Sequence, residues 1–328
     1  MDFTIYEGME TNKAVILVYI SRDQFKPEYR EKMTQAALGR EIVHTTDRSE
    51  IDKLIDRIEI CLGFGPWDLL AKMPRLGWFQ CWGAGVDGLV ANPELKDKPI
   101  KITNTSGIHV EQLTEHIFAM ILAFTRKFQI LYAAQKKHEW LDLEAPVIAG
   151  KTMLILGYGT IGEQCAKVAL GFNMKVIGLR RHPSENSSEI QIETADKLHT
   201  LLSEADYVVN ILPFTQDTRN LISKKEFSLM KKSAVYVNVG RGPTTDEAAL
   251  VDALQSGQIA GALLDVTVQE PLPKDSPLWD MDNVIITPHC AGWRPDYTSM
   301  AMDITLENLG RYNRGEALIN QIDKKAGY

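Results

Sequence analysis

Short runs of apolar residues alternate with polar, helix-like stretches through the first third of the chain. This pattern predicts four strands, which are Ala14–Ile20, Ile60–Phe64, Trp78–Trp82 and Ile100–Asn104. Strands separated by helices, rather than by tight turns, pair in parallel and leave the helices on the faces of the sheet. From His109 to about His138 the apolar positions recur at helical spacing, which predicts one long helix with a break near Lys127.

The same alternation returns after this helix and continues almost to the end of the sequence. It predicts six further strands, which are Thr152–Leu156, Lys175–Leu179, Tyr207–Leu212, Ala234–Val239, Ala260–Val266 and Val284–Thr287. Helical stretches occupy Gly162–Leu170, Lys224–Met230 and Asp246–Leu254, and a last amphipathic helix covers Asp296–Asn313. Repeated strand–helix units favour an α/β chain with a second, doubly wound parallel sheet.

Composition narrows the function classes without changing this fold. The 328 residues suggest two domains of about 150 residues each. The net charge is −7, so the chain lacks the basic surface that nucleic acids require. The longest apolar run, Ile117–Phe124, is far shorter than the ~20 residues that span a bilayer. We interpret Ala14–Ile20 as a core strand, and we expect a cytoplasmic protein with neither a nucleic-acid nor a membrane partner.

The cysteines of the chain show no pattern of ligation. They are scattered without a CxxC pair, at Cys61, Cys81, Cys165 and Cys290. Such spacing signals neither a disulfide framework nor a zinc site. We therefore expect reduced, mostly buried thiols and no bound metal.

A glycine-rich segment, Gly157–Gly162, follows one predicted strand and opens the next predicted helix. It fits GxGxxG: Gly157 permits a tight turn, Gly159 lets the backbone approach a pyrophosphate, and Gly162 allows close helix–strand packing. The helix N-terminus supplies N–H groups for the anion. This context favours a dinucleotide site over a glycine-rich turn without a ligand.

Two arginines, Arg180 and Arg181, follow the second strand of this unit, where an NAD-binding unit ordinarily has a carboxylate for the ribose hydroxyls. A guanidinium there would bind a 2′-phosphate through charge-assisted hydrogen bonds. NADP(H) is therefore the preferred cofactor and NAD(H) the alternative. The other interpretation is a pair of solvated surface arginines.

Four charged or titratable residues lie at or after the ends of later predicted strands, where they are expected to converge on the cofactor: Arg241, Asp265, Glu270 and His289. The candidate catalytic residues among them are Arg241, Glu270 and His289. In an open parallel sheet, ligands bind at this edge. A cation, two carboxylates and an imidazole around a nicotinamide predict hydride transfer with proton donation. Taken singly, Arg241 could pair with an acid and Glu270 could mark a turn, but the glycines at 240 and 242 suggest close approach to a ligand. His116, on the apolar stripe of a helix, is interpreted as structural.

These motifs, in this order and spacing, resemble those of the NAD(P)-dependent D-2-hydroxyacid dehydrogenases. The motifs are the glycine segment, the Arg241 segment, Glu270–Pro273 and Pro288–His289, and the resemblance is strongest from Gly150 to Gly292. It implies two doubly wound parallel-sheet domains with a cleft between them. One is a flavodoxin-like substrate domain formed by residues 1–106 and 295–328, and the other is a Rossmann-type cofactor domain formed by residues 107–294.

The resemblance also implies roles for individual residues. His289 matches the proton donor, Glu270 its carboxylate partner, and Arg241 the residue that grips the substrate carboxylate. Gly83–Asp87 looks like the loop whose backbone N–H groups, here at Ala84 and Gly85, hold the substrate acid. The residues that line the cofactor are then Gly157, Gly159, Thr160, Ile161, Gly162, Arg180, Arg181, Leu212, Val239, Gly240, Arg241, Asp265, His289 and Gly292.

The arginines look like those of NADPH-dependent glyoxylate/hydroxypyruvate reductases. We therefore expect an NADPH-preferring 2-oxoacid reductase that acts as a homodimer through its long helix, as this family usually does. Trp82, Trp140 and Trp293 are candidates for aromatic substrate walls or for ordinary core. Two alternatives remain open: an NAD-linked D-2-hydroxyacid or phosphoglycerate dehydrogenase acting oxidatively, and a dinucleotide-sensing binding protein similar to the corepressors that share this fold.

Overall fold

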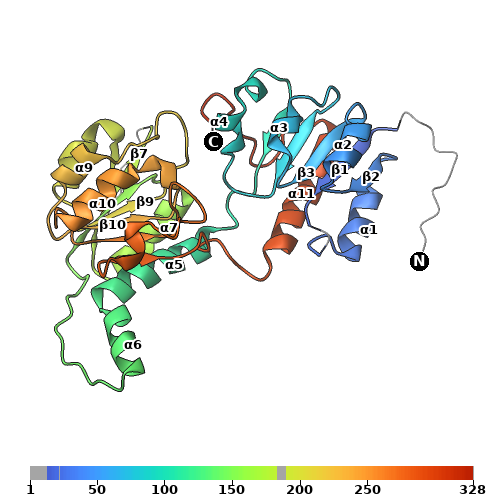
Figure 1. Ribbon diagram of the computed structural model, residues 1–328. Helices are drawn as coiled ribbons and strands as arrows, with labels where there is room; N and C mark the ends of the chain where they lie inside the picture. The colour runs from blue at the N-terminus through green and yellow to red at the C-terminus, as the bar shows by residue number, and fades with distance from the viewer. Residues whose placement is uncertain (1–12, 22, 183–189, 328) are drawn as a thin grey trace. The chain divides into compact units, whose positions relative to one another are not determined.

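The computed structural model describes residues 13–21, 23–182 and 190–327 of the chain (Figure 1). The chain divides into two compact units. Unit 1 comprises the chain up to Ile108 and from Pro295 onward, and unit 2 comprises His109–Arg294. The sequence placed the first boundary after residue 106, whereas the structure has it after Ile108.

Unit 1 is built on a five-stranded parallel sheet with the strand order β2-β1-β3-β4-β5, the order of flavodoxin-like folds. Its strands are β1 (Val15–Tyr19), β2 (Glu41–His44), β3 (Ile58–Gly63), β4 (Trp78–Cys81) and β5 (Lys101–Thr103). Its helices are α1 (Pro27–Ala36), α2 (Arg48–Leu54), α3 (Trp67–Leu70), α4 (Gly88–Ala91) and α11 (Tyr297–Arg314), with a 3-10 turn at Pro93–Leu95.

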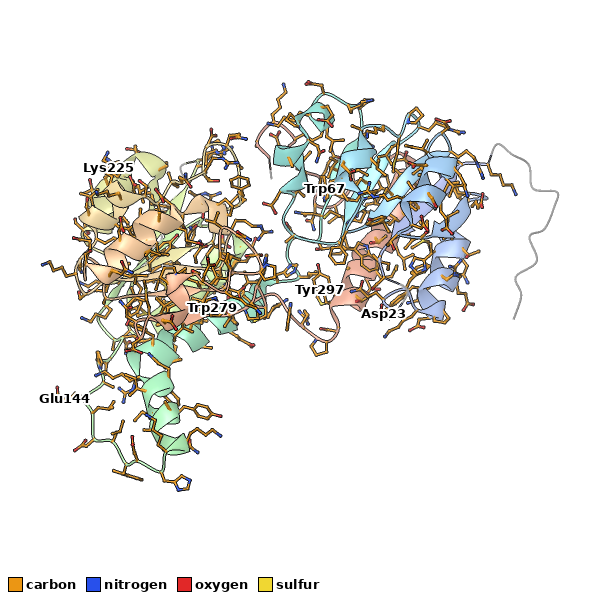
Figure 2. All side chains as sticks on the ribbon, in the orientation of Figure 1. Asp23, Trp67, Glu144, Lys225, Trp279 and Tyr297 are labelled. Carbon is orange, nitrogen blue, oxygen red and sulfur yellow. The ribbon has the colours of Figure 1, made fainter. Side chains whose placement is uncertain are left out.

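Strand β1, an interior strand of this sheet, is apolar at every buried position because both faces of the sheet are covered. Leu17 packs into the apolar cluster on one face, and its neighbour Val18 packs into the cluster on the other. Successive side chains of a strand point to opposite faces, so a strand that is covered on both sides cannot alternate with polar residues. On the first face lies Trp67 of α3 (Figure 2). Its ring meets that of Phe79 edge-on, with 4.9 Å between the ring centroids.

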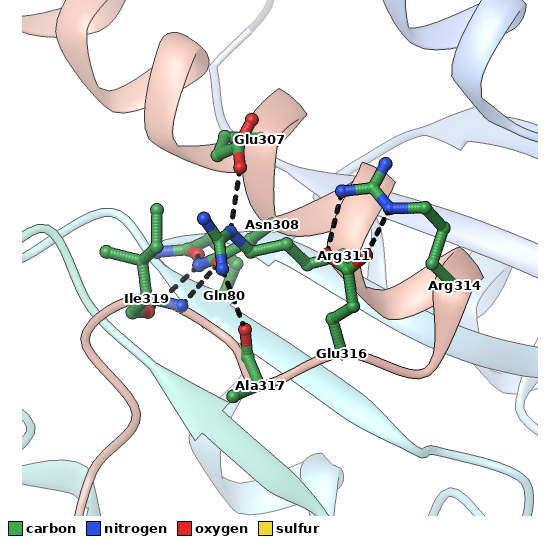
Figure 3. Close-up of polar contacts among 8 residues, drawn as sticks. All are labelled: Gln80, Glu307, Asn308, Arg311, Arg314, Glu316, Ala317 and Ile319. Atoms are coloured by element: carbon green, nitrogen blue, oxygen red, sulfur yellow. Dashed lines mark hydrogen bonds and ion pairs between the residues drawn. The ribbon is translucent and has the colours of Figure 1, made fainter.

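The C-terminal segment returns to this sheet after α11 (Figure 3). The side chain of Asn308 donates to Gln80 Oε1 of β4 at 2.9 Å. Asn308 also exchanges two hydrogen bonds with the backbone of Ile319, at 2.7 and 3.0 Å. Both side chains are buried, so these bonds satisfy polar groups that water cannot reach. The contacts tie the end of the chain to the middle of unit 1.

Unit 2 is built on a seven-stranded parallel sheet with the order β12-β11-β10-β9-β6-β7-β8, which is the Rossmann order with one additional strand. The strands are β6 (Thr152–Leu156), β7 (Lys175–Arg180), β8 (Ile190–Thr194), β9 (Tyr207–Asn210), β10 (Val235–Asn238), β11 (Gly261–Leu264) and β12 (Val284–Ile286). The helices are α5 (Val110–Thr125), α6 (Phe128–Lys136), α7 (Thr160–Gly171), α8 (Leu198–Leu202), α9 (Lys224–Leu229) and α10 (Glu247–Gln255). Short 3-10 turns occur at Ala195–Lys197, Gly242–Thr244 and Pro277–Asp280.

The two strands that the sequence did not predict, β2 and β8, lie at the edges of their sheets. No residue of either strand is fully buried. Edge strands need no continuous apolar run, because one side of each strand is unpaired and its faces are only partly covered. The other two edge strands, β5 and β12, were predicted from Ile100–Asn104 and Val284–Thr287, so the hydrophobic pattern misses only β2 and β8.

The long helix expected after His109 is two helices, α5 and α6, which are bent by 67° at their junction. Lys127 separates them with a φ of 58°, in the left-handed region that ends a helix. The predicted break is confirmed. Among the described residues, no single helix is long and apolar enough to cross a membrane, and only this bent pair passes when its two members are taken together.

Helix α6 and the loop after it extend away from the sheet of unit 2 (Figure 1). This arm carries many of the exposed large apolar side chains of the unit, which are Phe128, Ile130, Leu131, Tyr132, Trp140, Leu141 and Val147. Seven such side chains in one short stretch form the kind of apolar surface that marks an interaction site.

Candidate active site

A histidine–glutamate pair lies at the carboxyl edge of the sheet of unit 2. His289 follows β12, and its Nδ1 lies 2.7 Å from Oε2 of Glu270, in the loop after β11. Oε1 of Glu270 accepts the backbone N–H of Thr267 at 3.1 Å, which orients the carboxylate. The imidazole is 48% exposed, and its Nε2 has no partner among the described residues. The pair thus holds one ring nitrogen and leaves the other open to a ligand.

Asp265, at the end of β11, holds the loop that carries His289. It is only 2% exposed. Its carboxylate accepts the backbone N–H of Cys290 at 2.9 Å and that of Ala291 at 3.0 Å, and its own carbonyl accepts the N–H of His289 at 2.8 Å. His289 adopts a φ of 51°, which non-glycine residues seldom adopt. Three successive N–H groups bound to one buried residue keep the loop in this unusual conformation.

His116 of α5 belongs to the same network. Its Nε2 lies 2.9 Å from Oγ1 of Thr287 and 3.6 Å from Oδ1 of Asp265. The Thr287 hydroxyl donates to Asp265 at 2.6 Å. Sequence analysis predicted a structural role for His116 and did not single out Thr287, although Thr287 directly precedes the Pro288–His289 pair.

Cys290 forms a cluster with His116 and Asp265. Its Sγ, the Nε2 of His116 and a carboxylate oxygen of Asp265 lie within 4.8 Å of one another, and these are residue types that zinc binds. Donors already occupy both oxygens of Asp265. Burial, followed by the nearby Asp265 charge, raises the pKa of the Cys290 thiol, which favours its protonated form. A hydrogen-bonded network therefore accounts for the cluster without a metal.

Arg241 follows β10 in a loop that is fixed through its backbone. The carbonyl of Arg241 accepts from Thr244 Oγ1 at 2.6 Å and from Asn238 Nδ2 at 3.3 Å. Its guanidinium donates to the carbonyl of Gly240 at 2.7 Å. Asn238 and Thr244 are both buried, so the loop is anchored in the interior of the unit. Sequence analysis did not identify these two anchors.

The glycines beside Arg241 have a different explanation from the one expected. A Cβ on Gly240 would lie 2.6 Å from the carbonyl oxygen of Leu212, and one on Gly242 would lie 1.9 Å from that of Thr267. The close approach at both glycines is to neighbouring loops of the protein. Packing against these loops is therefore one reason for glycine at both positions, and the approach to a ligand stays a prediction.

His109, just before α5, lies near Arg241 and was not singled out from the sequence. Burial, then the positive charges of Arg241 and Arg294, lower the pKa of His109 to about 4. A Cβ on Gly292 would come within 2.9 Å of the His109 ring. A neutral imidazole thus packs against the segment that follows His289, and it lies within electrostatic reach of Arg241.

The glycine-rich turn has the geometry that a dinucleotide needs. Gly157 has a φ of 96°, and its N–H donates to the carbonyl of Leu179 at 3.1 Å, so the turn is bound to the end of β7. A Cβ on Gly162 would lie 3.1 Å from the carbonyl of Gly157, which explains the close helix–strand packing. A Cβ on Gly159 would meet nothing within 4 Å.

That open space lies at the N-terminus of α7, where the first N–H groups, including those of Thr160 and Ile161, have no partner within the helix. The residues present therefore fit a bound pyrophosphate. Leu212 and Val239 follow β9 and β10, whose carboxyl ends lie at the same edge of the parallel sheet. Gly178 has a packing role that sequence analysis did not identify. A Cβ added to Gly178 would lie 2.3 Å from the ring of Tyr158, so only glycine leaves room for that ring.

The two arginines after β7 differ in their surroundings. Arg180 is the last residue of the strand and is half-buried. Arg181 is exposed and lies 3.8 Å from the carboxylate of Asp217, in the loop after β9. No acidic residue directly follows β7 in the sequence, but the fold places Asp217 beside Arg181. Asp217 would therefore compete with a 2′-phosphate for Arg181, which the sequence did not reveal.

Ala84 and Gly85, the expected acid-binding residues, belong to unit 1. They lie in the loop after β4, and Asn104 Nδ2 donates to the carbonyl of Ala84 at 2.6 Å. Within the described residues, neither backbone N–H donates to a protein acceptor. Trp82, one of the candidate substrate walls, is 1% exposed and donates to Thr305 Oγ1, so it belongs to the core of unit 1. Trp140 and Trp293 are exposed.

Comparison with known proteins identifies the family. Residues 118–291 match the model of the D-isomer specific 2-hydroxyacid dehydrogenase, NAD binding domain. The chain belongs to this family and is an NAD(P)-dependent oxidoreductase.

Individual relatives support this assignment. The chain is 41% identical over 228 residues to a glyoxylate/hydroxypyruvate reductase B of Enterobacter sp. (strain 638), covering 67% of this chain and 70% of that one. An NADPH-dependent glyoxylate/hydroxypyruvate reductase of Sinorhizobium meliloti, solved with NADP and sulfate, is 30% identical with a TM-score of 0.82 and covers 96% of this chain and 100% of its own. A D-lactate dehydrogenase of Aquifex aeolicus, solved with NAD and lactic acid, is 27% identical with a TM-score of 0.79 and covers 92% and 96%.

Proposed function

We propose that this protein reduces short 2-oxoacids, such as glyoxylate or hydroxypyruvate, to D-2-hydroxyacids at the expense of NADPH, with His289 as the proton donor. The observation that carries the proposal is the 2.7 Å contact between His289 Nδ1 and Glu270, in a loop that Asp265 holds in a left-handed conformation. The names of the relatives supply the substrate class.

When bound, the nicotinamide supplies the hydride that attacks the substrate carbonyl. The carbonyl oxygen gains negative charge, and it needs a proton from the protein. His289 is suited to this task, because Glu270 accepts from Nδ1 and stabilises the positive imidazolium, while Nε2–H is left to donate. After donation the ring is neutral and keeps its hydrogen bond to Glu270.

Three residues are proposed to bind the substrate acid: Arg241, Ala84 and Gly85. Arg241 offers a planar fork of donors that matches a carboxylate. The backbone N–H groups of Ala84 and Gly85 are open donors of the kind that bind anions. Unit 1 is thus the substrate domain and unit 2 the cofactor domain.

NADPH preference rests on Arg180 and Arg181, which are placed after β7, where the ribose 2′-position of a dinucleotide is read. The contact between Arg181 and Asp217 is the observation that favours the second candidate, an NAD-linked dehydrogenase. We rank NADPH first, because Arg180 is half-buried at the strand end and no ion pair occupies it among the described residues. Asp265 and Gly292 would lie beside the nicotinamide end.

The arm formed by α6 and residues 137–147 is the proposed homodimer contact. Its exposed apolar side chains need cover from water, and a second copy of the chain supplies an identical surface. We further propose a cytoplasmic location and no nucleic-acid partner, in keeping with the net charge of −7. A corepressor-like binding protein has no need of the His289–Glu270 pair and ranks last.

The direct experiment is a turnover assay with purified protein, in which oxidation of NADPH or NADH is followed with glyoxylate, hydroxypyruvate and pyruvate. We expect turnover with at least one 2-oxoacid and a higher kcat/KM for NADPH. Binding of NADPH without turnover of any 2-oxoacid would favour the dinucleotide-sensing alternative.

A further inference from the structure

We propose that His116 and Thr287 are positioning residues for catalysis, which act through Asp265 to hold His289 in its proton-donating position. This inference rests on the proposed role of His289. It assigns a function to both residues. Sequence analysis had predicted a structural role for His116 and had not identified Thr287.

The hydrogen bonds run in one direction, from His116 through Thr287 to Asp265, and we call this chain of bonds the relay. Thr287 Oγ1 is 2.6 Å from Asp265 Oδ1, and a carboxylate can only accept, so the single hydroxyl proton of Thr287 lies in this bond. Oγ1 of Thr287 must then accept at its contact with His116 Nε2, at 2.9 Å; its contact with Met120 Sδ, at 4.0 Å, is much longer. His116 therefore carries a proton on Nε2 and donates it to Thr287.

The other end of the relay is the catalytic loop. Asp265 receives the backbone N–H groups of Cys290 and Ala291 on its two oxygens, and its carbonyl receives that of His289. Rotation of the Asp265 carboxylate would release or displace both of the first two N–H groups together. The hydroxyl of Thr287 is the side-chain donor that opposes such rotation, because it binds the same oxygen as the N–H of Cys290.

The loop needs this restraint more than an ordinary loop does. The φ of 51° at His289 is a high-energy conformation for a residue with a Cβ, and it persists only where surrounding bonds hold it. Asp265 is almost fully buried, so water cannot replace a lost donor at little cost. Loss of the Thr287 hydroxyl should therefore shift the imidazole, and displacements of about 1 Å can reduce turnover by ~10²-fold.

Replacing Thr287 tests the relay. Thr287→Val keeps the side-chain shape and removes the hydroxyl, whereas Thr287→Ser keeps the hydroxyl. We expect Thr287→Val to lower kcat with glyoxylate by about ten- to a hundredfold. NADPH affinity, measured by quenching of protein fluorescence, should change less than about threefold, and Thr287→Ser should recover most of kcat. Thr125→Val is the matched control, because it removes a buried hydroxyl of the same unit that bonds Tyr207 instead.

His116 tests the other end of the same relay. His116→Gln retains an N–H donor on a flexible chain, and His116→Phe retains a ring without one. The proposal expects the Phe variant to lose more kcat than the Gln variant, again with little change in NADPH affinity. If every one of these variants lost kcat and NADPH affinity by the same factor and also melted at a lower temperature, His116 and Thr287 would have a merely structural role. That result would overturn the proposal.

A double-mutant cycle separates this inference from the proposed function. If Thr287 acts through His289, Thr287→Val should cost almost nothing further in a His289→Asn background, whereas independent effects would multiply. Multiplicative losses would contradict the relay while leaving His289 as donor. Normal turnover in His289→Asn would instead contradict the proposed function itself.

Discussion

Arg181 and Asp217 face each other across two loops of unit 2, with 3.8 Å between guanidinium and carboxylate. Both side chains are exposed, so water and salt screen the pair and its own stabilising energy is small. Its importance lies in competition, because a 2′-phosphate and Asp217 would seek the same guanidinium.

This relationship leads to a prediction about cofactor choice. Asp217→Asn should raise the NADPH over NADH ratio of kcat/KM by a few-fold, since it removes a negative charge near the phosphate site. The double variant Arg180→Ala, Arg181→Ala should raise the KM for NADPH by about tenfold or more, or ~1.4 kcal/mol, with little effect on NADH. An unchanged KM for NADPH in the double variant would refute the assignment of these arginines.

Gly159 and Gly171 provide a matched pair for the cofactor site, since an added Cβ at either position meets no protein atom within 4 Å. Gly159 lies at the N-terminus of α7 and Gly171 at its C-terminus. We expect Gly159→Ala to weaken NADPH binding by about tenfold, because the methyl group would occupy the space of the pyrophosphate. Both variants should melt close to the wild type, and Gly171→Ala should bind NADPH normally. Normal binding by Gly159→Ala would mean that the cofactor lies elsewhere.

Substitution of Gly240, unlike that of Gly159, should lower the stability of the fold. A Cβ there would lie 2.6 Å from the carbonyl oxygen of Leu212, so Gly240→Ala must displace backbone. We expect a loss of about 1–3 kcal/mol in the free energy of unfolding, which chemical denaturation with urea would measure. Wild-type stability in this variant would show that the loops after β9 and β10 are not packed as described.

Glu270→Gln should report on the His289–Glu270 pair. The substitution keeps the shape of the side chain and removes the negative charge that lies 2.7 Å from His289 Nδ1. We expect kcat with glyoxylate to fall by about tenfold or more while NADPH affinity changes little, because a neutral amide binds the positive imidazolium less strongly than a carboxylate does. Wild-type kcat in Glu270→Gln would separate Glu270 from the proton transfer.

The interior of the fold could be predicted because buried parallel strands are continuous apolar runs. Each of the ten predicted strands corresponds to an observed one, and the break at Lys127 lies where the helical pattern weakens. The edge strands β2 and β8 escaped notice because charged or polar residues interrupt their apolar positions, whereas the equally part-buried edge strand β12 is apolar throughout. Arg241, Asp265 and His289 were correctly predicted to lie at one edge of one sheet. The carboxyl ends of parallel strands always share an edge, so this placement depends only on strand direction.

Features that depend on which loops meet could not be predicted. The glycines at 240 and 242 approach protein backbone, which no local pattern reveals. Asp217 reaches Arg181 only because β9 and β7 flank β6 in the sheet. Thr287 looks like an ordinary strand-end residue until its hydroxyl is seen to bond a buried carboxylate. Long-range proximity, rather than residue type, gives these positions their roles.

The predicted carboxylate requirement rests on Arg241 and on the open N–H groups of Ala84 and Gly85. Glyoxylate and hydroxypyruvate should be reduced with a kcat/KM far above those of glycolaldehyde and acetone, because a substrate without the acid cannot accept hydrogen bonds from these donors. Arg241→Lys should lower kcat/KM for the acids, since a point charge cannot replace the fork of donors. Similar constants for acid and non-acid carbonyls would contradict the assigned role of Arg241.

Single-turnover reduction of glyoxylate by excess enzyme loaded with NADPH, compared between wild type and His289→Asn, measures how much His289 contributes to proton transfer. We expect the wild type to consume NADPH in step with glyoxylate. His289→Asn should bind NADPH normally and react more slowly by a factor on the order of 10²–10⁴, the usual contribution of a positioned acid. A folded His289→Asn variant that reduces glyoxylate at the wild-type rate would contradict the role of His289 as proton donor.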